Sequence, residues 1–288
     1  MSLPVAIVDA FTSTAGQGNR AGVVTKTEGL DEKAMQAAAR AVAASETAFV
    51  FPGPRLRYFT PEEEIPFCGH ATVASIHYLA EKGSIRAPGT IEVQCAIGPL
   101  KIEIDEVRIV WIDAGPVEWS PLRGMEENQL MSLLGGKVSM RNASLPILQS
   151  GKKLFVPLAK REDLWRLTPD WDALVLIHIS LGIMGVYAFT LEAVEPGNIS
   201  QGRFFAPAVG IREDPVTGAA SVPLADYFVR HGVLKLPASG GTVRARAEQG
   251  DAMGKPGRVE LEVTGSPGKV ERVRIGGRAV TVMEGLLK

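Results

Sequence analysis

The sequence predicts an α+β fold made of two similar halves, each a curved and largely antiparallel sheet wrapped around one central helix. Two observations carry this prediction: a long motif that occurs twice, and runs of alternating apolar and polar residues outside that motif. Alternation with a period of two is typical of half-buried strands. A motif repeated at an offset of about half the chain indicates a duplicated unit rather than a short-period solenoid.

The repeated motif consists of an apolar segment with a proline, a turn that ends in glycine, and a helix. Its copies run from Phe59 to Gly83 and from Phe205 to Gly232. The first helix is expected at His70–Lys82, and apolar residues surround its circumference, which predicts a helix buried inside a sheet. Two similar halves predict one cleft between them. Gly69 and Gly218 would leave the first N–H groups of the two helices free to bind an anion there.

The remaining elements follow from local patterns. Further helices are expected at Asp31–Ala44 and around Glu127–Leu134. The uncharged segment Ala173–Leu191 approaches the length of a membrane span, but its Val- and Ile-rich halves predict two buried strands joined near Gly182. Other strands are predicted at Lys101–Asp105, Val107–Ile112 and Val259–Val263, and as a hairpin of Val273–Ile275 and Ala279–Met283 around Gly276 and Gly277.

The chain of 288 residues is long enough for two domains of ordinary size. The glycine and prolines of Asp113–Arg123 mark the expected crossing between them. The predicted domains are residues 1–114 and 115–275, and the C-terminal strand 276–288 is a candidate to return to the first half.

Charge and cysteine content narrow the class of protein. The chain has 31 Lys and Arg against 32 Asp and Glu, and no basic run longer than the pair Lys152–Lys153, so neither nucleic acid nor a membrane surface is expected as a partner. Cys68 and Cys95 form no disulfide framework and no clustered set of metal ligands. No metal or cofactor is therefore expected. The N-terminus lacks the features of a signal peptide, and a cytoplasmic protein is expected.

The glycine-rich segment Gly16–Gly22 has the composition of a dinucleotide-binding loop. Its third glycine comes one position late, and the following residues favour a strand, so a Rossmann fold is rejected. Gly18 and Asn19 are expected to form a tight connection, from which the Asn19 amide could line a site.

Glu46 is the sharpest single candidate for catalysis. It follows the Asp31–Ala44 helix and enters the apolar run Thr47–Phe51. Burial without a positive partner would raise the pKa of its carboxyl group and suit it to proton transfer near neutral pH. The alternative is a glutamate at a strand edge that faces water, and position alone slightly favours this alternative.

Three more candidates lie in the two glycine turns. His70 sits at the start of the first repeated helix, and Asp214 precedes Gly218 by four residues. Counted from the two phenylalanines, Asp214 corresponds to Cys68, so a thiol and a carboxylate could flank a substrate. The alternatives are that Asp214 caps its own turn, that His70 bonds a loop, and that Cys68 is a small buried apolar residue.

Ordered motifs cover nearly the whole chain. They are VDAFT at Val8–Thr12, GN and AGVV within Gly18–Val24, SETAFV at Ser45–Val50, RYFTP at Arg57–Pro61, CGHAT at Cys68–Thr72, FAP at Phe205–Pro207, EDPVTG at Glu213–Gly218, EQG at Glu248–Gly250, and GG at Gly276. In this order and spacing they resemble the PhzF-like family, named for a phenazine-biosynthesis isomerase and related in fold to diaminopimelate epimerase.

The resemblance implies two similar, pseudo-twofold-related domains with the active site between them, and commonly a homodimer. It also implies that Glu46 is the catalytic acid/base and that His70 and Asp214 contact the substrate. The other candidate substrate-binding residues are Asn19, Cys68, Gly69, Thr217, Gly218 and Ala219.

Two departures from the family pattern bear on the substrate. Arg20 stands where the family usually has proline, and Ala219 stands where it often has serine. Loss of the serine hydroxyl removes a hydrogen bond with a net effect of about 0.5 to 1.5 kcal/mol, which favours a different substrate.

These residues predict a cofactor-independent isomerase that moves a proton between carbons of a small carboxylate, with Glu46 as acid/base. The first alternative is a racemase or epimerase. Its usual pair of thiols, one in each half, is not expected because the second half offers Asp214 and Thr217, although a pair of Cys68 and Asp214 stays open. The second alternative is a protein that binds a small acid without catalysis, for which Ala219 is a suitable kind of change.

Overall fold

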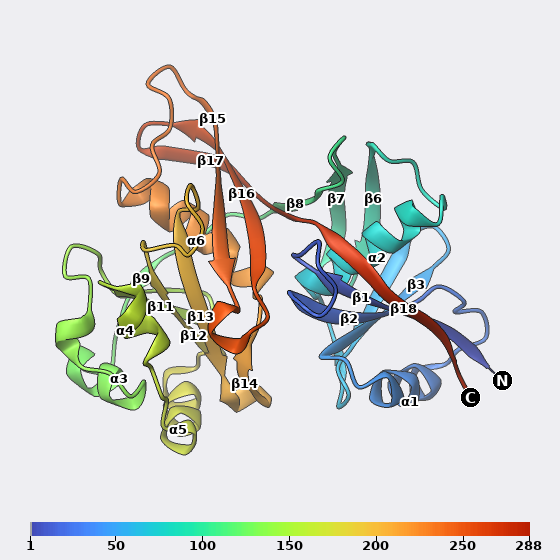
Figure 1. Cartoon of the computed structure of the whole chain (residues 1–288), viewed down its shortest axis with the longest axis horizontal. Coiled ribbons are helices and arrows are strands. Elements are labelled where there is room, and N and C mark those ends of the chain that lie inside the picture. The colour runs from blue at the N-terminus through green and yellow to red at the C-terminus, as the bar shows by residue number, and fades with distance from the viewer. Residues whose placement is uncertain (1) are drawn as a thin grey trace. The chain divides into compact units, whose positions relative to one another are not determined.

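The computed structural model describes residues 2–288 and divides them into two compact units. Unit 1 contains the residues up to Ala114 together with Arg274–Lys288, and unit 2 contains Gly115–Val273. Each unit has its own set of paired strands and its own buried helix (Figure 1).

The sheet of unit 1 is curved and largely antiparallel. Its strands are β1 Leu3–Ala10, β2 Asn19–Val24, β3 Glu46–Phe51, β4 Arg55–Phe59, β5 Glu64–Ile65, β6 Gly89–Cys95, β7 Gly98–Ile104, β8 Val110–Ala114 and β18 Ala279–Leu287. Strands β18, β1 and β2 pair antiparallel, β2 pairs parallel with β3, and β3 pairs antiparallel with β4. Strand β4 pairs antiparallel with β5 and parallel with β6, and β6, β7 and β8 continue antiparallel.

Two helices complete unit 1, and both confirm sequence predictions. Helix α1 (Glu32–Val42) begins after Asp31, whose side chain accepts a hydrogen bond from the Ala34 amide at 2.8 Å. Helix α2 (Gly69–Glu81) contacts β1, β2, β3, β8 and β18. Its hydroxyls are satisfied internally, since Ser75 Oγ donates to the Ala71 carbonyl at 2.7 Å. A largely apolar helix whose buried hydroxyls are paired is stable at the centre of a sheet.

Unit 2 has more helices. Its strands are β9 Ser120–Pro121, β10 Leu148–Ser150, β11 Lys153–Leu158, β12 Gly185–Thr190, β13 Ser200–Ala206, β14 Ile211–Asp214, β15 Gly241–Gln249, β16 Gly257–Ser266 and β17 Lys269–Gly277, of which the last residues belong to unit 1. Its helices are α3 Glu127–Leu133, α4 Arg161–Trp165, α5 Trp171–Leu181 and α6 Gly218–Arg230, and its 3-10 turns are η1 Val138–Met140, η2 Pro207–Val209 and η3 Asp251–Met253.

The strands of unit 2 pair in the same order as those of unit 1. Strands β9, β10 and β11 pair antiparallel, β11 pairs parallel with β12, and β12 pairs antiparallel with β13. Strand β13 then pairs antiparallel with β14 and parallel with β15, which pairs antiparallel with β16. In this order β13, β14 and α6 occupy the places of β4, β5 and α2, so the repeated motif forms the same element of structure in both units.

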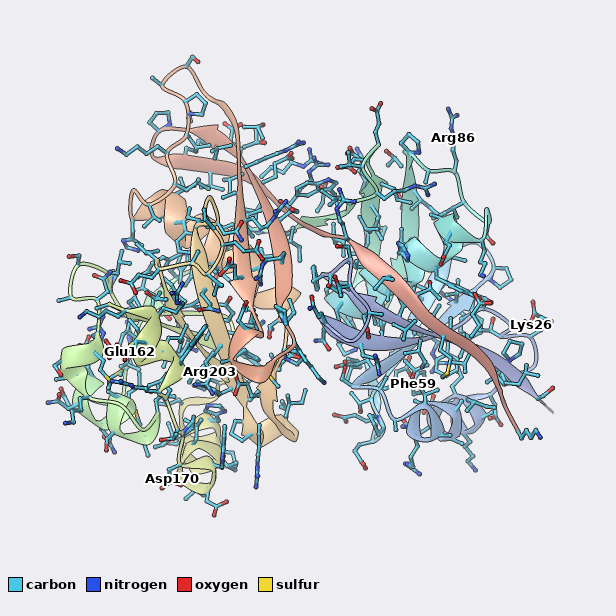
Figure 2. The ribbon with its side chains drawn as sticks, in the orientation of Figure 1. Lys26, Phe59, Arg86, Glu162, Asp170 and Arg203 are labelled. Atoms are coloured by element: carbon cyan, nitrogen blue, oxygen red, sulfur yellow. The ribbon has the colours of Figure 1, made fainter. Side chains whose placement is uncertain are left out.

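Each unit is packed around aromatic side chains. In unit 1, Phe59, which is labelled in Figure 2, meets Phe49 edge to face at 5.4 Å. In unit 2, Tyr227 of α6 meets Phe189 of β12 edge to face at 5.5 Å. The buried Arg203 of β13, also labelled in Figure 2, forms a two-pronged ion pair with Glu213 of β14, with both contacts at 2.8 Å. This pair fixes β14, the strand that ends at Asp214.

The prediction of two buried strands in Ala173–Leu191 is wrong in its first half. That part forms α5, which Gly182 ends in a left-handed conformation, and only the second half is a strand, β12. The reason is topological: β11 and β12 pair in parallel, and parallel strands need a crossover, which is usually helical. The helix exposes Leu176 and Ile179 by 67% and 69%. Within residues 2–288 no helix combines the length and apolar character needed to cross a membrane.

Two further strand predictions need correction. The predicted hairpin around Gly276 and Gly277 is wrong, because β18 pairs with β1 while β17 pairs with β8, and a single residue, Arg278, separates β17 from β18. The first part of the predicted strand Val107–Ile112 is a turn, in which Arg108 has φ 66° and Asp105 accepts backbone hydrogen bonds.

Candidate functional site

Glu46 is the first residue of β3 and is buried, with 8% of its surface exposed. Strand β3 pairs with β2 in parallel, and Ala21 lies opposite Glu46. Because β2 and β3 belong to the sheet that surrounds α2, this position faces away from water at the start of the helix. The alternative of a water-facing glutamate at a strand edge is wrong.

His70 lies in the first turn of α2 and contacts two candidate residues through its two ring nitrogens. Its Nε2 lies 3.0 Å from Glu46 Oε2, and its Nδ1 lies 3.3 Å from Cys68 Sγ. The first contact is an ion pair, and Oε2 makes no hydrogen bond of good geometry among residues 2–288.

The proton affinities of this pair follow from its burial and its charges. Burial alone would raise the pKa of Glu46, but the charge of His70, with a smaller contribution from Ser45, lowers that pKa below its ordinary value of 4.5. Burial opposes protonation of His70, but Cys68 and Glu46 raise the pKa of the imidazole well above 6.5. The expectation of a raised Glu46 pKa without a positive partner is therefore wrong, because the fold supplies His70 as that partner.

Cys68 precedes the first helical residue and is 7% exposed. Burial raises the pKa of its thiol above the ordinary value of 9.0. The thiol is therefore protonated at neutral pH. The structure agrees with a small buried residue, but one whose sulfur also touches the His70 ring at 3.3 Å.

Asn19 and Ser45 extend this group. Asn19 is the first residue of β2 and is 2% exposed, and its Oδ1 lies 3.5 Å from Ser45 Oγ. The same hydroxyl lies 3.3 Å from His70 Nε2. Because Ser45 lies in no nucleophile-elbow context, its residue type alone indicates no role. The signal that was available is its place directly before Glu46 in the SETAFV motif.

Arg20, at the position where the family resemblance implies proline, forms a salt bridge. Its Nε and Nη2 donate to the two carboxylate oxygens of the buried Asp9 at 2.8 and 3.1 Å. The preceding Gly18 has φ 65°, and a Cβ there would lie 2.2 Å from the Ala10 carbonyl oxygen. The tight connection predicted at Gly18 and Asn19 is confirmed, and Arg20 ties it to β1.

The candidates in unit 2 form a separate, hydrogen-bonded group. Thr217 Oγ1 donates to Asp214 Oδ2 at 2.6 Å. Gln249, at the end of β15 and 1% exposed, accepts from the Thr217 amide at 3.0 Å and donates to the Asp214 carbonyl at 2.8 Å. The predicted alternative, in which Asp214 bonds its own turn, describes this contact well. Gln249 was missed although it lies in the EQG motif, because neither its residue type nor its spacing indicated a partner.

The helix starts correct the alignment of the two halves. Cys68 directly precedes α2, and Thr217 directly precedes α6. Counted from the helix, Thr217 rather than Asp214 therefore corresponds to Cys68. The three residues inserted in the second turn shift Asp214 away from the helix start. Gly218 is buried, and Ala219, where a serine would stand, is exposed in the first turn of α6.

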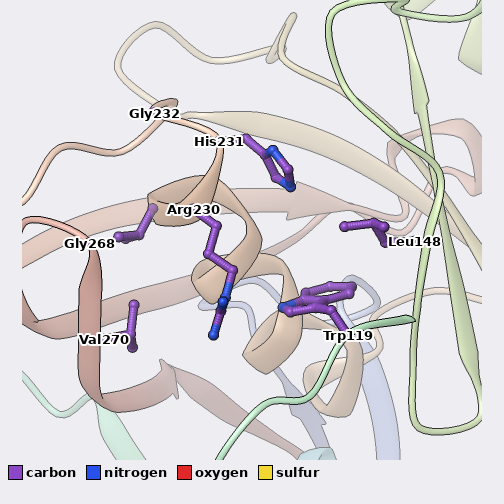
Figure 3. Close-up of a pocket in the computed structure, with 8 residues that line it drawn as sticks. Trp119, Leu148, Arg230, His231, Gly232, Gly268 and Val270 are labelled. Atoms are coloured by element: carbon purple, nitrogen blue, oxygen red, sulfur yellow. The ribbon is translucent and has the colours of Figure 1, made fainter. Parts of the chain in front are cut away.

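The other end of α6 borders a cavity of about 550 Å³. Figure 3 shows Arg230 beside Trp119 in this cavity, and His231 also lines it. The Trp119 indole donates to Asp226 Oδ2 at 2.6 Å, and Arg230 pairs with the same carboxylate. Asp214, Thr217 and Gly218 lie at the opposite end of the helix, so this cavity is separate from the predicted site.

The prediction that the chain has no clustered set of metal-binding side chains is wrong. Single donor atoms of Glu46, Cys68 and His70 all lie within 4.8 Å of one another, and all three residues are buried. The chain therefore does hold a cluster of residues of the kinds that bind metals. Sequence spacing hid it, because Glu46 reaches the other two only through the packing of β3 against α2.

The comparisons with known proteins agree with this fold and with the sequence motifs. The profile of the PhzC-PhzF family, described as phenazine biosynthesis-like protein, matches residues 8–285. The chain is 38% identical to "Uncharacterized isomerase YddE" of Escherichia coli K12, over 95% of this chain and 94% of that one. It is 34% identical to "Uncharacterized isomerase YfhB" of Bacillus subtilis, over 97% of both chains.

Comparison with solved structures also identifies proteins of the PhzF family. The crystal structure of the Bacillus anthracis phenazine biosynthesis protein of the PhzF family matches with a TM-score of 0.91 at 28% identity, over 100% of this chain and 99% of that one. A hydroxyproline epimerase from Agrobacterium vitis matches with a TM-score of 0.62 at 12% identity, over 99% and 92%, and so shares the fold alone. The predicted resemblance is confirmed: the chain belongs to the PhzC-PhzF family of phenazine biosynthesis-like proteins, and it is an isomerase.

Proposed function

We propose that the isomerase moves a proton between two carbons of a small carboxylate-bearing metabolite, without a cofactor, and that Glu46 carries the proton. The observation that supports this most is the buried Glu46 carboxylate, whose Oε2 has no hydrogen-bond partner among residues 2–288. A carboxylate oxygen free of hydrogen bonds keeps a lone pair for a substrate proton. The lowered pKa means that this carboxylate is ionised at neutral pH and acts first as a base.

In this mechanism the charge of His70 keeps Glu46 ready to release the proton that it has accepted. Its imidazole is protonated near neutral pH because its pKa is raised well above 6.5, and its Nε2 lies 3.0 Å from Glu46 Oε2. The positive charge favours the carboxylate over the carboxylic acid. A proton that Glu46 takes from one carbon is therefore readily given back to another carbon on the same face. A positioned acid/base of this kind typically contributes about a hundredfold to ten-thousandfold.

The substrate carboxylate is assigned to the helix starts. Gly69 and Gly218 begin the two 13-residue helices α2 and α6, and neither carries a side chain that would cover the first amides. Such amides and the helix dipole favour an anion. Asp214, held by Thr217 and Gln249, would orient a polar group of the same substrate. The homodimer implied by the resemblance and the placement of the site between the two halves stay predictions.

An epimerase is the alternative that one observation favours. Cys68 Sγ and Glu46 Oε2 both contact the His70 ring, so two groups that can carry a proton lie close together at the start of α2. Both cysteines of the chain belong to unit 1, however, so a thiol pair with one member in each unit does not exist. The raised pKa of the Cys68 thiol also makes it a poor base at neutral pH.

The test is proton NMR in deuterated buffer, with a panel of small unsaturated and amino-bearing carboxylic acids. Wild-type protein is expected to put deuterium into one compound and to convert it into an isomer. Glu46→Gln should slow this by about a hundredfold to ten-thousandfold. Asp214→Asn should lower kcat/KM by about tenfold to a hundredfold, the usual effect of losing a charged hydrogen bond.

Glu262→Gln is the matched control, because Glu262 is also buried but pairs with Arg244 on the β15–β16 ladder. It should keep the wild-type exchange rate. Full exchange in Glu46→Gln would exclude Glu46 as the proton carrier. Ligand-induced shifts without any exchange in wild type would instead favour a binding protein, and inversion without transposition would favour the epimerase.

A further inference from the structure

The start of α2 gathers three different kinds of metal-binding side chain. Glu46, Cys68 and His70 are 8%, 7% and 7% exposed. The His70 Nε2 lies 3.0 Å from Glu46 Oε2 and 3.9 Å from Cys68 Sγ. A carboxylate, a thiol and an imidazole thus converge on one point, and the carboxylate oxygen that faces this point has no hydrogen bond within the described chain.

These distances suit a tetrahedral ion. Zinc binds such donors at about 2.0–2.3 Å, which places neighbouring donor atoms about 3.4–3.6 Å apart. The observed separations of 3.0 and 3.9 Å lie on either side of this value. The donor atoms of the three residues all lie within 4.8 Å of one another, so small shifts of the side chains would bring all three donors to one ion. The fourth position of the tetrahedron would stay open.

The charges also balance. A divalent cation bound by a carboxylate, a thiolate and a neutral imidazole forms a neutral unit, which a buried position tolerates far better than a net charge. Binding converts the thiol and the imidazolium to their ligand forms, and their two protons leave to water. The thiolate selects soft or borderline ions, so zinc is favoured over magnesium or calcium.

We propose that Glu46, Cys68 and His70 form a site for one zinc-like divalent cation, and that the bound cation blocks proton transfer by occupying the carboxylate and the imidazole. The cation site itself is independent of the proposed function, and only the blocking rests on it. The chain would then exist in two states, a metal-free state that can carry protons and a metal-bound state that cannot.

Cobalt(II) tests the site directly, because a thiolate ligand gives cobalt a charge-transfer absorption that oxygen and nitrogen ligands do not. Metal-free wild-type protein titrated with cobalt should develop this band with one ion per chain, and added zinc should remove it. Cys68→Ser should abolish the band. Cys95→Ser, which changes the other cysteine, should keep it, and Glu46→Gln should weaken cobalt binding at least about tenfold.

Circular dichroism of each variant shows whether it is folded, and Cys68→Ala replaces Cys68→Ser if the latter is not. A folded wild-type protein without the band at millimolar cobalt would overturn the proposal. So would a band that survives in Cys68→Ser or disappears in Cys95→Ser. Zinc should also stop deuterium exchange in wild type, and a chelator should restore it. If no substrate is ever found, the band still decides the metal site, so the two failures remain distinguishable.

Discussion

The turn before α2 and the turn before α6 occupy the same place in two sheets of the same pairing order, yet they carry different chemistry. The first brings together an ion pair and a thiol, Glu46, His70 and Cys68. The second brings together a carboxylate, a hydroxyl and an amide, Asp214, Thr217 and Gln249. A repeated scaffold can therefore assign charge to one copy and hydrogen bonding to the other without a change of fold.

The two groups also differ in how completely their polar atoms are used. Glu46 Oε2 is left without a hydrogen bond among residues 2–288, whereas both side-chain polar atoms of Gln249 are occupied. Unsatisfied buried atoms are costly and often mark a position with a function. The comparison predicts that changes in the first turn alter proton transfer, stability and the pH dependence of both, while changes in the second alter stability and substrate affinity without shifting the pH dependence.

The largest effect is expected from breaking the ion pair with His70→Asn. Removing one partner leaves Glu46 buried and uncompensated, at a cost of about 3–5 kcal/mol in the free energy of unfolding near neutral pH. The pKa of Glu46 should then rise, because burial raises it and the opposing charge is gone. The acidic limb of the kcat/KM profile should move to higher pH, and urea unfolding and steady-state kinetics measure the two effects.

The pH dependence of stability follows from the two shifts. Glu46 has a lowered pKa in the folded protein, so its contribution is present above 4.5 and is lost as pH falls through the folded value. His70 has a raised pKa, so its contribution is complete below 6.5 and is lost as pH rises through the folded value. Both contributions are complete between pH 4.5 and pH 6.5, so the stability difference between wild type and His70→Asn should be greatest in that range and should fall at lower and at higher pH.

His77→Asn provides the control on the same helix, since His77 is only partly buried and its contact with Glu81 is long, 3.9 Å. It should leave unchanged both the pH dependence of the free energy of unfolding and the acidic limb of the kcat/KM profile. A His70→Asn variant with an unchanged acidic limb would show that Glu46 does not depend on His70.

The contrast between the turns also explains how far sequence alone could go. Both buried helices were predictable, because α2 is largely apolar around its circumference and each helix begins at a glycine. Helix α5 was not, since its uncharged sequence fits a buried strand and only the parallel pairing of β11 with β12 requires a helix. Local pattern does not report which strands become neighbours.

The same limit applies to the site. Glu46 could be selected as a candidate, and its motif supported it, but its partner could not be read from spacing. His70 reaches it because β3 packs against α2, a contact between residues far apart in sequence. Without that contact, the direction of the Glu46 pKa shift was predicted with the wrong sign. Gln249 and Ser45 were not identified from sequence for a similar reason, because their contacts become visible only in the folded chain.

A smaller effect is expected in the second turn, from Gln249→Ala. The change leaves the buried Thr217 amide without its acceptor, which typically costs about 1–3 kcal/mol in the free energy of unfolding. Loss of the bond to the Asp214 carbonyl should also loosen the turn and raise KM, while the acidic kinetic limb stays where it is. Gln149→Ala, which removes one exposed bond to the Gly151 carbonyl, should change little by urea unfolding. A shift of the acidic limb of the kcat/KM profile in Gln249→Ala would mean that both turns depend on the same titrating group.

The smallest effect is expected from Ala219→Ser, which introduces the serine that the family resemblance implies at this position. Ala219 is exposed in the first turn of α6, so the added hydroxyl meets no packing constraint and should change stability by less than about 0.5 kcal/mol. If the substrate has a polar group that this hydroxyl can reach, KM should fall by about twofold to tenfold, corresponding to one hydrogen bond. A rise in KM would instead mean that the natural substrate presents an apolar group to this position. Because kcat should stay unchanged in both cases, isothermal titration and steady-state kinetics on the same variant separate recognition in the second turn from proton transfer in the first.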